Sequence, residues 1–214
     1  MNAASPFKRA SDLFSAITSQ DRIRDAYERH RDGLIVSTSF GAQAAVMLHK
    51  AKLVVPDIKV VFVDTGYLFP ETYKFAEELT KALELNLHTY RPLRTAAQQE
   101  ALHGKRWEGD EEDKQAYNLE NKVEPMNRAV KELGVTGWLS GLRRDQSARR
   151  AGLDFEEQQG AVTKFYPILD MTGRDVYYYL KENGLPNHPL VELGYTSIGD
   201  VHSTKLGEQR GECG

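Results

Sequence analysis

Cysteine is almost absent from this chain of 214 residues, in which Cys213 stands alone. One cysteine cannot form a disulfide within the chain, and it cannot supply the several thiolates of an all-cysteine metal or iron–sulfur site. No apolar run comes near the roughly 20 residues that a membrane-spanning helix needs, and no apolar segment follows the first basic residues as in a signal peptide. These absences predict a cytoplasmic protein with a reduced thiol and no membrane partner.

An excess of positive charge is also missing. The 28 lysines and arginines are outnumbered by 31 aspartates and glutamates, which gives a formal charge of −3. That balance argues against nucleic acid as a partner, so any anionic ligand must be held by a local group of cations. Hydrophobic residues make up 40 % of the chain, and the length suits one domain with a well-buried core.

Alternating strand and helix patterns predict the fold class. The apolar, β-branched run that begins at Leu34 is typical of a buried strand, and the alanine-rich residues after it favour a helix to about Lys52. The same patterns predict strands at Lys59–Val63, Leu87–Tyr90, Thr136–Ser140 and Lys164–Leu169, helices at Ser11–His30, Pro70–Leu85, Thr95–Trp107, Val123–Leu133 and Arg174–Asn183, an exposed segment at Gly109–Asn121 and a loop-like end at Asn187–Gly214. Successive strand–helix–strand units imply parallel pairing. We therefore expect an α/β fold with a doubly wound, mostly parallel sheet, which binds ligands beyond the carboxyl ends of its strands.

Small polar residues follow the first two strands, where such a sheet binds its ligand. Ser37–Gly41 joins the Leu34 strand to its helix, so backbone N–H groups at the helix start could hold an anion. Gly41 would let a ligand approach the backbone closely. Asp64–Gly66 ends the second strand and should face the same crevice. An ordinary connection with a serine as N-cap is the alternative that the sequence leaves open.

Four arginines follow the strand Thr136–Ser140 within eight positions. They are Arg143, Arg144, Arg149 and Arg150. Guanidinium groups bind sulfate and phosphate with paired donors and keep their charge at any working pH. A strand end should bring at least Arg143 and Arg144 to the crevice, which favours anion binding there. A basic surface helix is the alternative.

The C-terminal residues carry two histidines and the cysteine, whose types alone assign no role. Nothing near His188 or His202 in the sequence makes either a metal ligand. A thiol close to the chain end and flanked by glycines is hard to bury, so Cys213 is either incidental or reactive. The residues from Thr204 to Cys213 span about 30 Å at full extension, which would let this end fold over the crevice.

Six blocks of sequence, in order from about residue 34 to residue 214, resemble the signature of the assimilatory 3′-phosphoadenylyl-sulfate reductases. The blocks are Ser37–Gln43, Asp64–Thr72, Gly141–Ser147, His188–Leu190, Gly194–Asp200 and Glu212–Gly214. The resemblance implies an adenine-nucleotide α-hydrolase-like fold, a modified relative of the ATP pyrophosphatases. It also implies the step of sulfate assimilation that reduces 3′-phosphoadenylyl sulfate to sulfite and adenosine 3′,5′-bisphosphate.

The same resemblance implies a role for each part of the chain. Cys213 would attack the sulfur of the substrate and become an S-sulfocysteine, which reduced thioredoxin or glutaredoxin would resolve. Residues 1–204 would form the nucleotide-binding domain, residues 205–214 a mobile arm that carries Cys213, and two chains a homodimer. The positions that match the substrate-binding motifs are Ser37, Thr38, Ser39, Phe40, Gly41, Gln43, Asp64, Thr65, Gly66, Lys122, Arg143, Arg144, Gln146, Ser147 and His202.

Relatives that reduce adenylyl sulfate, which lacks the 3′-phosphate, carry an iron–sulfur cluster held by four cysteines. The matching positions here are Tyr117, Asn118, Asp200 and Ser203, none of which supplies a thiolate. The resemblance therefore predicts a chain with no cluster, no other bound cofactor or metal, and a preference for the 3′-phosphorylated substrate.

Two alternatives keep this fold and change the function. One is an adenylyl-sulfate reductase, and the other is a nucleotide-binding protein related to ATP pyrophosphatases, in which Cys213 is incidental and no redox turnover occurs. ATP pyrophosphatases usually hold pyrophosphate in a Ser-Gly-Gly-x-Asp-Ser turn. Ser39–Gln43 lacks the second glycine and the aspartate of that turn, which disfavours pyrophosphatase chemistry.

Overall fold

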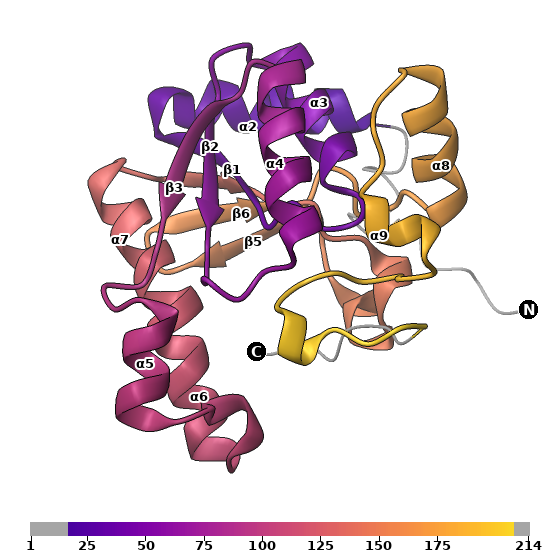
Figure 1. The fold of residues 1–214 in the computed structure, drawn as a ribbon. Coiled ribbons are helices and arrows are strands. Elements are labelled where there is room, and N and C mark those ends of the chain that lie inside the picture. Colours follow the sequence, from indigo (N-terminus) through magenta and orange to yellow (C-terminus); the bar gives the residue numbers. More distant parts are fainter. Residues whose placement is uncertain (1–16, 208–214) are drawn as a thin grey trace, which may run out of the picture.

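The centre of the molecule is a twisted sheet, seen in a computed structural model that describes residues 17–207 (Figure 1). Its six strands lie in the order β3-β2-β1-β4-β6-β5. They are β1 (Leu34–Thr38), β2 (Lys59–Val63), β3 (Asn86–Tyr90), β4 (Gly137–Leu139), β5 (Glu156–Gln159) and β6 (Val162–Phe165). Every neighbouring pair is parallel except β5 with β6. The predicted doubly wound, mostly parallel sheet is confirmed, with the order reversing between β1 and β4.

Helices cover both faces of the sheet. α2 (Ser19–His30), α3 (Ala44–Val54), α4 (Pro70–Ala82) and α8 (Gly173–Glu182) bury their apolar sides in the larger core cluster, and α7 (Glu124–Glu132) covers the opposite face. Val36 of β1 packs in the first cluster and its neighbour Ile35 in the second, because successive side chains of a strand point to opposite faces. This alternation explains why β1 is apolar on both sides.

Capping side chains and one proline set several helix boundaries. Thr18, Thr95 and Thr172 each form a capping box with the third residue of the helix that follows. Pro70 opens α4 in its first turn, as predicted. α2 begins at Ser19, which is later than the predicted helix start, and residues 11–16 of that prediction lie outside the described residues.

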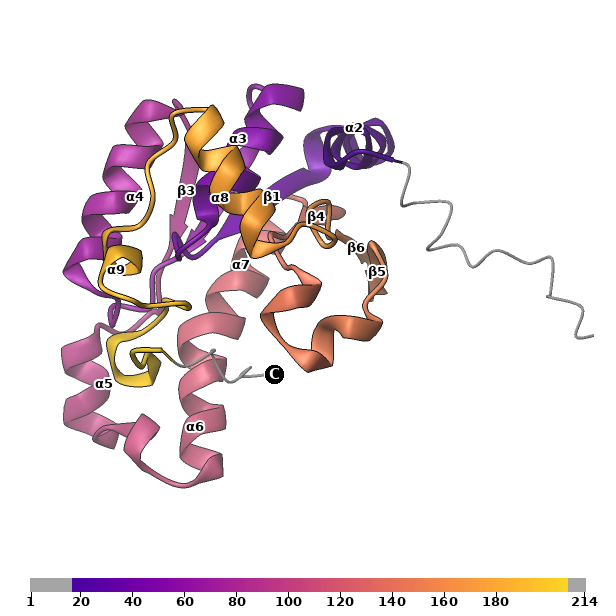
Figure 2. The same cartoon turned by 90° about the vertical axis from the view of Figure 1, so that its right-hand side faces the viewer.

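Two helices, α5 (Ala96–His103) and α6 (Glu111–Asn118), form an arm that projects beyond the sheet (Figures 1 and 2). α6 continues through a π-helical turn, Leu119–Val123, into α7, so one helical rod joins the arm to the sheet. The predicted exposed segment Gly109–Asn121 is exposed in its acidic first half, but Tyr117 is buried and Asn121 is fully enclosed.

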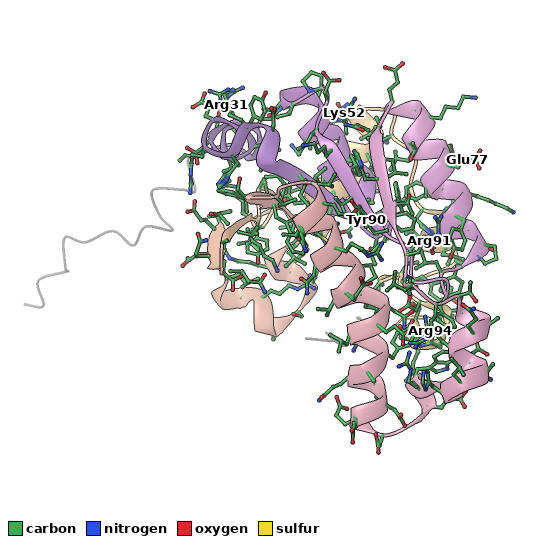
Figure 3. All side chains as sticks on the ribbon, turned by 90° about the vertical axis from the view of Figure 1, so that its left-hand side faces the viewer. Arg31, Lys52, Glu77, Tyr90, Arg91 and Arg94 are labelled. Atoms are coloured by element: carbon green, nitrogen blue, oxygen red, sulfur yellow. The ribbon has the colours of Figure 1, made fainter. Side chains whose placement is uncertain are left out.

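Buried polar contacts hold the base of this arm. The side-chain amides of Gln99 and Asn121 exchange two hydrogen bonds, at 2.8 and 2.9 Å. Glu120 pairs with Arg106 at 2.6 Å and with Arg94 at 3.3 Å. Figure 3 shows Arg94 on the segment that links β3 to α5. These contacts tie α5 and the segments on either side of it to the π-helical turn, and the sequence pattern does not reveal them.

Three further features differ from the predicted elements. β5 was not expected, and it pairs antiparallel with β6. β6 ends at Phe165, earlier than the predicted strand Lys164–Leu169. The loop-like C-terminal part contains a short helix, α9 (Pro189–Glu192), and a 3₁₀ turn at Val201–Ser203. Among the described residues, no helix has the length and apolarity to span a membrane.

Candidate functional site

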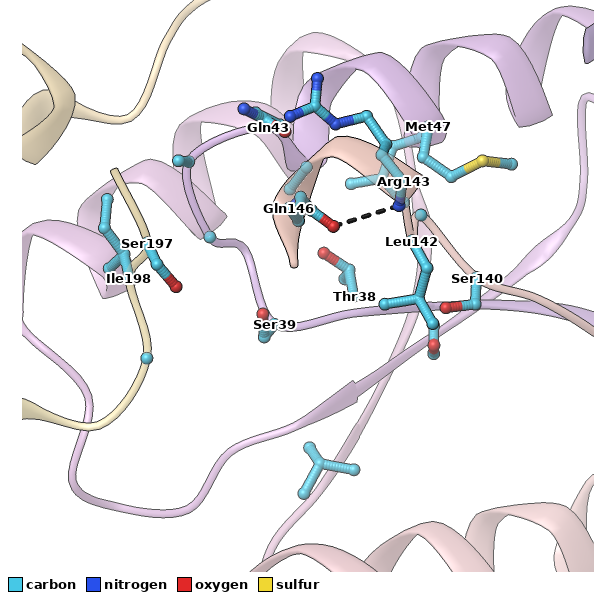
Figure 4. A pocket seen from close by; sticks show the side chains of 18 of the residues that line it. Thr38, Ser39, Gln43, Met47, Ser140, Leu142, Arg143, Gln146, Ser197 and Ile198 are labelled. Atoms are coloured by element: carbon cyan, nitrogen blue, oxygen red, sulfur yellow. Dashed lines mark hydrogen bonds between the residues drawn. The ribbon is translucent and has the colours of Figure 1, made fainter. Parts of the chain in front are cut away.

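A cavity of about 600 Å³ opens beyond the carboxyl ends of β1, β2 and β4 (Figure 4). Its walls come from the strand ends, the turn after β1, the start of α3, Thr65 and Leu68 after β2, the helix that contains the π-helical turn, and the segment after β4. Residues 196–200 complete the walls, and they belong to the segment 195–206, which we call the strap. This is the edge of the sheet at which a doubly wound fold binds its ligand, and the cavity lies where the sequence predicted the site.

The turn after β1 is anchored by a buried ring. Phe40 is fully buried, packs edge-on against Phe62 with 5.0 Å between ring centroids, and adopts φ of 48°, a conformation that bulky residues rarely take. Thr38 Oγ1 accepts a hydrogen bond from the backbone N–H of Phe40 at 2.9 Å. Since Phe40 points into the core, the cavity is lined instead by Ser37, Thr38, Ser39, Gly41 and Gln43. The N-cap of α3 is Gln43, without a capping side-chain bond, so the plain serine cap is not formed.

The segment after β4 brings a buried guanidinium to the cavity. Arg143 is 3 % exposed, and its Nη2 lies 3.1 Å from Asp145 Oδ1. Its Nε and Nη1 are buried and have no hydrogen-bond partner in residues 17–207. Burial lowers the pKa of Arg143, against the opposing charge of Asp145. Figure 4 shows the side chain directed toward Gln43, whose Oε1 is also a buried atom without a partner in that range.

Gln146 stabilises the segment after β4, whereas the side chain of Arg144 points away from the cavity. Gln146 Oε1 accepts from the backbone N–H of Arg143 at 3.1 Å and from the guanidinium of Arg150, and both Gln146 and Arg150 line the cavity. Arg144 instead donates to the carbonyl of Leu153 at 2.8 and 3.2 Å. Arg143 has an extended backbone, which sends neighbouring side chains to opposite sides.

The prediction that Arg143 and Arg144 both reach the crevice is therefore wrong for Arg144, whose guanidinium lies over the ring of Phe155. Ser147 also does not line the cavity. Arg150, which was noted as part of the arginine group but was not assigned to the site, does line it.

The π-helical turn and the strap meet across the cavity wall. Lys122 Nζ lies 3.0 Å from Oδ2 of Asp200, and the hydroxyl of Thr65 donates to Oδ1 of Asp200 at 2.5 Å. Asp200 is 1 % exposed. Burial acts to raise the pKa of Asp200, but Lys122 and Thr65 outweigh it and hold that pKa below its usual value. All three residues line the cavity, and Asp200 was not predicted to do so.

The strap closes one side of the cavity. Thr196, Ser197, Ile198 and Gly199 line it together with Asp200. A Cβ atom at Gly41 would lie 3.1 Å from the carbonyl oxygen of Ile198. Gly41 therefore gives room to the strap, a use of this glycine that the sequence did not indicate. The block Gly194–Asp200 was the signal that could have placed the strap residues in the site.

Two predicted residues at the end of β2 do not line the cavity. Asp64 accepts hydrogen bonds from the Tyr73 hydroxyl at 2.7 Å, from Arg91 Nε at 2.8 Å and from the backbone N–H of Gly66 at 3.0 Å. Figure 3 shows Arg91 next to Tyr90 at the end of β3. The expectation that Asp64–Gly66 faces the crevice therefore holds for Thr65 alone, because the carboxylate of Asp64 is used to fix the loop.

His202 lies behind the cavity wall in an aromatic cluster. Its ring stacks on Trp107 with centroids 4.3 Å apart and planes 8° apart, and Tyr67 and Tyr117 contact it edge-on. Its Nε2 is 3.9 Å from Asp200 Oδ2, and His202, a predicted substrate-binding residue, does not line the cavity. Trp107 belongs to the arm, and Figure 2 shows this end of the strap beside α5 and α6.

The thiol of Cys213 lies outside the described residues, as does most of the predicted mobile arm 205–214. Within residues 17–207, no group of three or more His, Asp or Glu side chains could hold a metal ion. The cavity thus offers hydroxyls, amides and cations, namely Lys122, Arg143 and Arg150, and this combination binds anionic groups such as phosphate or sulfate.

The family model and two of the most similar relatives carry the same description. A family model described as the phosphoadenosine phosphosulfate reductase domain matches residues 33–206. A protein of Vibrio parahaemolyticus named phosphoadenosine 5′-phosphosulfate reductase is 52 % identical over 192 residues, which cover 90 % of this chain and 74 % of the relative. A protein of the same name from Pectobacterium carotovorum is 51 % identical, with 90 % of this chain and 79 % of the relative covered.

Solved structures agree with these sequences. The phosphoadenylyl-sulfate reductase of Candida auris, crystallised as a phosphate complex, superposes with a TM-score of 0.78 at 30 % identity and covers 95 % of this chain and 100 % of its own. The FMN adenylyltransferase of Candida glabrata matches with a TM-score of 0.65 at 13 % identity, covering 98 % of this chain and 73 % of its own, which shows a shared fold alone. The predicted adenine-nucleotide α-hydrolase-like fold is confirmed.

Proposed function

Because the chain belongs to the phosphoadenosine phosphosulfate reductase family, we propose that it reduces 3′-phosphoadenylyl sulfate to sulfite with Cys213 as the nucleophile. The observation that carries this proposal is the cavity at the sheet edge, into which Arg143 brings buried donors that have no acceptor within residues 17–207. Such donors are costly to bury, and the oxygens of a phosphosulfate would satisfy them.

The chemistry proceeds by two thiol attacks. The Cys213 thiolate attacks the sulfur of the sulfo group, an S–S bond forms, and the bond from sulfur to the bridging phosphate oxygen breaks. The electron pair of that bond leaves with adenosine 3′,5′-bisphosphate, and the enzyme carries an S-sulfocysteine. A thiolate of reduced thioredoxin or glutaredoxin then attacks the Cys213 sulfur and releases sulfite. The second thiol of the donor resolves the mixed disulfide, so the dithiol supplies both electrons.

The residues of the cavity suit the charges in the first step. Negative charge grows on the bridging oxygen as the S–O bond breaks, and Arg143, Arg150 and Lys122 are placed around the cavity to neutralise it. The turn Ser37–Gly41 would hold the phosphosulfate or the 3′-phosphate with its hydroxyls and backbone N–H groups. Asp145 and Gln146 keep Arg143 in place.

The assignment of Cys213 is tested by sulfite release. Purified enzyme is mixed with 3′-phosphoadenylyl sulfate and reduced thioredoxin or glutaredoxin, and sulfite is measured for the wild type and for Cys213→Ser. We expect turnover from the wild type only. Without the reductant, intact mass should show one added sulfo group on the wild type and none on Cys213→Ser. Equal sulfite from both proteins would refute the mechanism.

We further propose that the enzyme works without an iron–sulfur cluster and prefers the 3′-phosphorylated substrate. Tyr117, Asn118, Asp200 and Ser203 stand where related enzymes carry cluster cysteines, and thiolates are the ligands that such a cluster needs. An iron assay and a comparison of kcat/KM for the two nucleotides test this. Stoichiometric iron and faster reduction of adenylyl sulfate would favour the alternative, an adenylyl-sulfate reductase.

A homodimer is part of the same proposal, on the strength of the family resemblance. Analytical ultracentrifugation of the full chain over a range of concentrations measures the oligomeric state. A monomer at all concentrations that support full activity would remove the dimer from the proposal.

A further inference from the structure

We propose that Asp200 is a positioning residue that holds the Lys122 ammonium at the cavity and limits how tightly the nucleotide binds. The inference rests on the proposed function, because it concerns the same cavity and its anionic ligand. Beyond the proposed function, it explains why a carboxylate lies in a site that binds anions.

The position of Asp200 is fixed from three elements. Its Oδ2 lies 3.0 Å from Lys122 Nζ on the π-helical turn, and its Oδ1 accepts from the Thr65 hydroxyl after β2 at 2.5 Å. Its backbone forms a bridge with Leu68, and the next N–H, that of Val201, donates to the carbonyl of Tyr67 at 2.8 Å. The carboxylate is thus held on both oxygens and is almost fully buried.

Lys122 depends on this carboxylate for its place. Its side chain is 26 % exposed and its ammonium lies 5.5 Å from the centroid of the Tyr117 ring, which is a weaker contact than the ion pair. Lysine is a flexible point charge, so a fixed partner decides where its ammonium lies. The π-helical turn, by inserting a residue into the helical register, gives Lys122 its direction toward the strap.

The negative charge of Asp200 also opposes the binding of an anionic nucleotide in the same cavity. Asp200 lines the same cavity as Arg143 and Arg150 and carries a full negative charge there, since Lys122 and Thr65 stabilise its ionised form. It repels the phosphates of any nucleotide in the cavity, and in a poorly hydrated site this repulsion is weakly screened. Asp200 therefore weakens ground-state binding while it orders the cation needed in the transition state.

The strap extends the effect of Asp200 along the chain. Thr204 Oγ1 donates to the backbone carbonyl of Asp200 at 2.9 Å, and the same hydroxyl accepts from the N–H of Gly199 at 3.0 Å. Cys213 follows in the sequence, a few residues beyond the strap. The backbone around Asp200 is therefore tied to Thr204, further along the strap.

The first experiment separates binding from turnover in Asp200→Asn. Asparagine keeps an oxygen for Thr65 and removes the charge, so the strap retains its hydrogen bond. Calorimetry with adenosine 3′,5′-bisphosphate should give a Kd about threefold below that of the wild type, because a like charge has left the cavity. Sulfite release should show kcat lower by about tenfold or more, because the ammonium has lost its fixed partner.

The second experiment is a double-mutant cycle with Lys122→Met. This single variant leaves the Asp200 carboxylate buried without its cation, and we expect Tm to fall by about 5–10 °C. Lys122→Met combined with Asp200→Asn should recover at least half of that loss, because no unpaired charge remains. Bisphosphate binding should weaken by about thirtyfold in both proteins that carry Lys122→Met.

The control is Asp170→Asn, which removes the carboxylate of another ion pair, that with Arg22 at 2.9 Å, away from the cavity. Its kcat and Kd should match those of the wild type. The proposal is overturned if Asp200→Asn keeps the wild-type kcat, if it leaves bisphosphate binding unchanged or weakens it, or if the two Tm changes simply add. The binding and Tm measurements do not involve Cys213, so they judge this inference even if the thiol mechanism fails.

Discussion

Two neighbouring arginines, Arg143 and Arg144, differ in function because their side chains point in opposite directions. Arg143 and Arg144 have the same charge and adjoin in the sequence, yet one guanidinium lines the cavity and the other donates to the carbonyl of Leu153. The sequence could place the pair at the end of a strand, but it could not say which member turns inward. The extended backbone at Arg143 makes that choice, and it depends on how the segment packs after β4.

Replacing Arg143 should therefore be far more damaging than replacing Arg144. We expect Arg143→Gln to lower kcat/KM for 3′-phosphoadenylyl sulfate by about 10²–10³, the usual loss when one preorganised donor to a developing charge is removed. Arg143→Lys should recover only part of this, because lysine lacks the paired donors. Arg144→Gln is the matched control and should change kcat/KM by less than about threefold. Equal losses in the two glutamine variants would contradict the assigned directions.

At the scale of elements, the sequence predicted those strands and helices that are marked by a local pattern of apolar residues or by a proline. Apolar runs identified β1, β2 and the approximate positions of β3 and β4, and Pro70 marked the start of α4. β5 was missed because Glu156–Gln159 carries no apolar residue and becomes a strand only by pairing with β6. The position of Asp200 in the site could not be predicted for the same reason. It depends on contacts with Lys122 and Thr65, which are distant in the sequence.

The turn after β1 contacts the strap at Gly41, and the substitution of this glycine by alanine tests whether that contact matters. In Gly41→Ala the new Cβ would lie 3.1 Å from the Ile198 carbonyl oxygen, so the strap must shift by a few tenths of an ångström. We expect KM for the nucleotide to rise by about fivefold, since small displacements of positioning groups reduce binding and rate. Steady-state kinetics measure this.

Gly152→Ala is the control for that substitution. A Cβ at Gly152 would meet no atom within 4 Å, and this glycine does not line the cavity. Its kinetics should equal those of the wild type. A wild-type KM in Gly41→Ala would mean that the strap does not depend on its contact with the turn.

At the scale of the whole molecule, His188 ties two distant parts of the core together. It is fully buried, its Nδ1 accepts from the Leu190 N–H at 3.2 Å, and its Nε2 lies 3.0 Å from the Thr72 hydroxyl in α4. Since Nδ1 is an acceptor, the ring proton belongs on Nε2. The sequence assigned no role to His188, and the structure shows a neutral core histidine that caps α9.

This histidine should make stability depend on pH. Burial lowers the pKa of His188 to about 4, whereas a histidine of the unfolded chain titrates near 6.5. The unfolded state therefore binds more protons between these values, so stability is lost as pH falls through this range. Between pH 7 and pH 5 we expect the wild type to lose about 2 kcal/mol more unfolding free energy than His188→Gln.

Urea denaturation at the two pH values measures that difference. His103→Gln, at an exposed position on the projecting arm, should follow the wild-type curve and serves as the control. If His188→Gln and the wild type lose equal stability between pH 7 and pH 5, the histidine is not the group responsible.

The strand that the sequence concealed also limits how copies of this molecule can associate. All four side chains of β5 are exposed and polar, and two are carboxylates. A foreign strand that added itself there would have to remove water from Glu156 and Glu157 and break the bidentate contact of Glu156 with Arg29. The charged side chains of β5 therefore disfavour the addition of a further strand, and with it fibre-like stacking, at this border of the sheet.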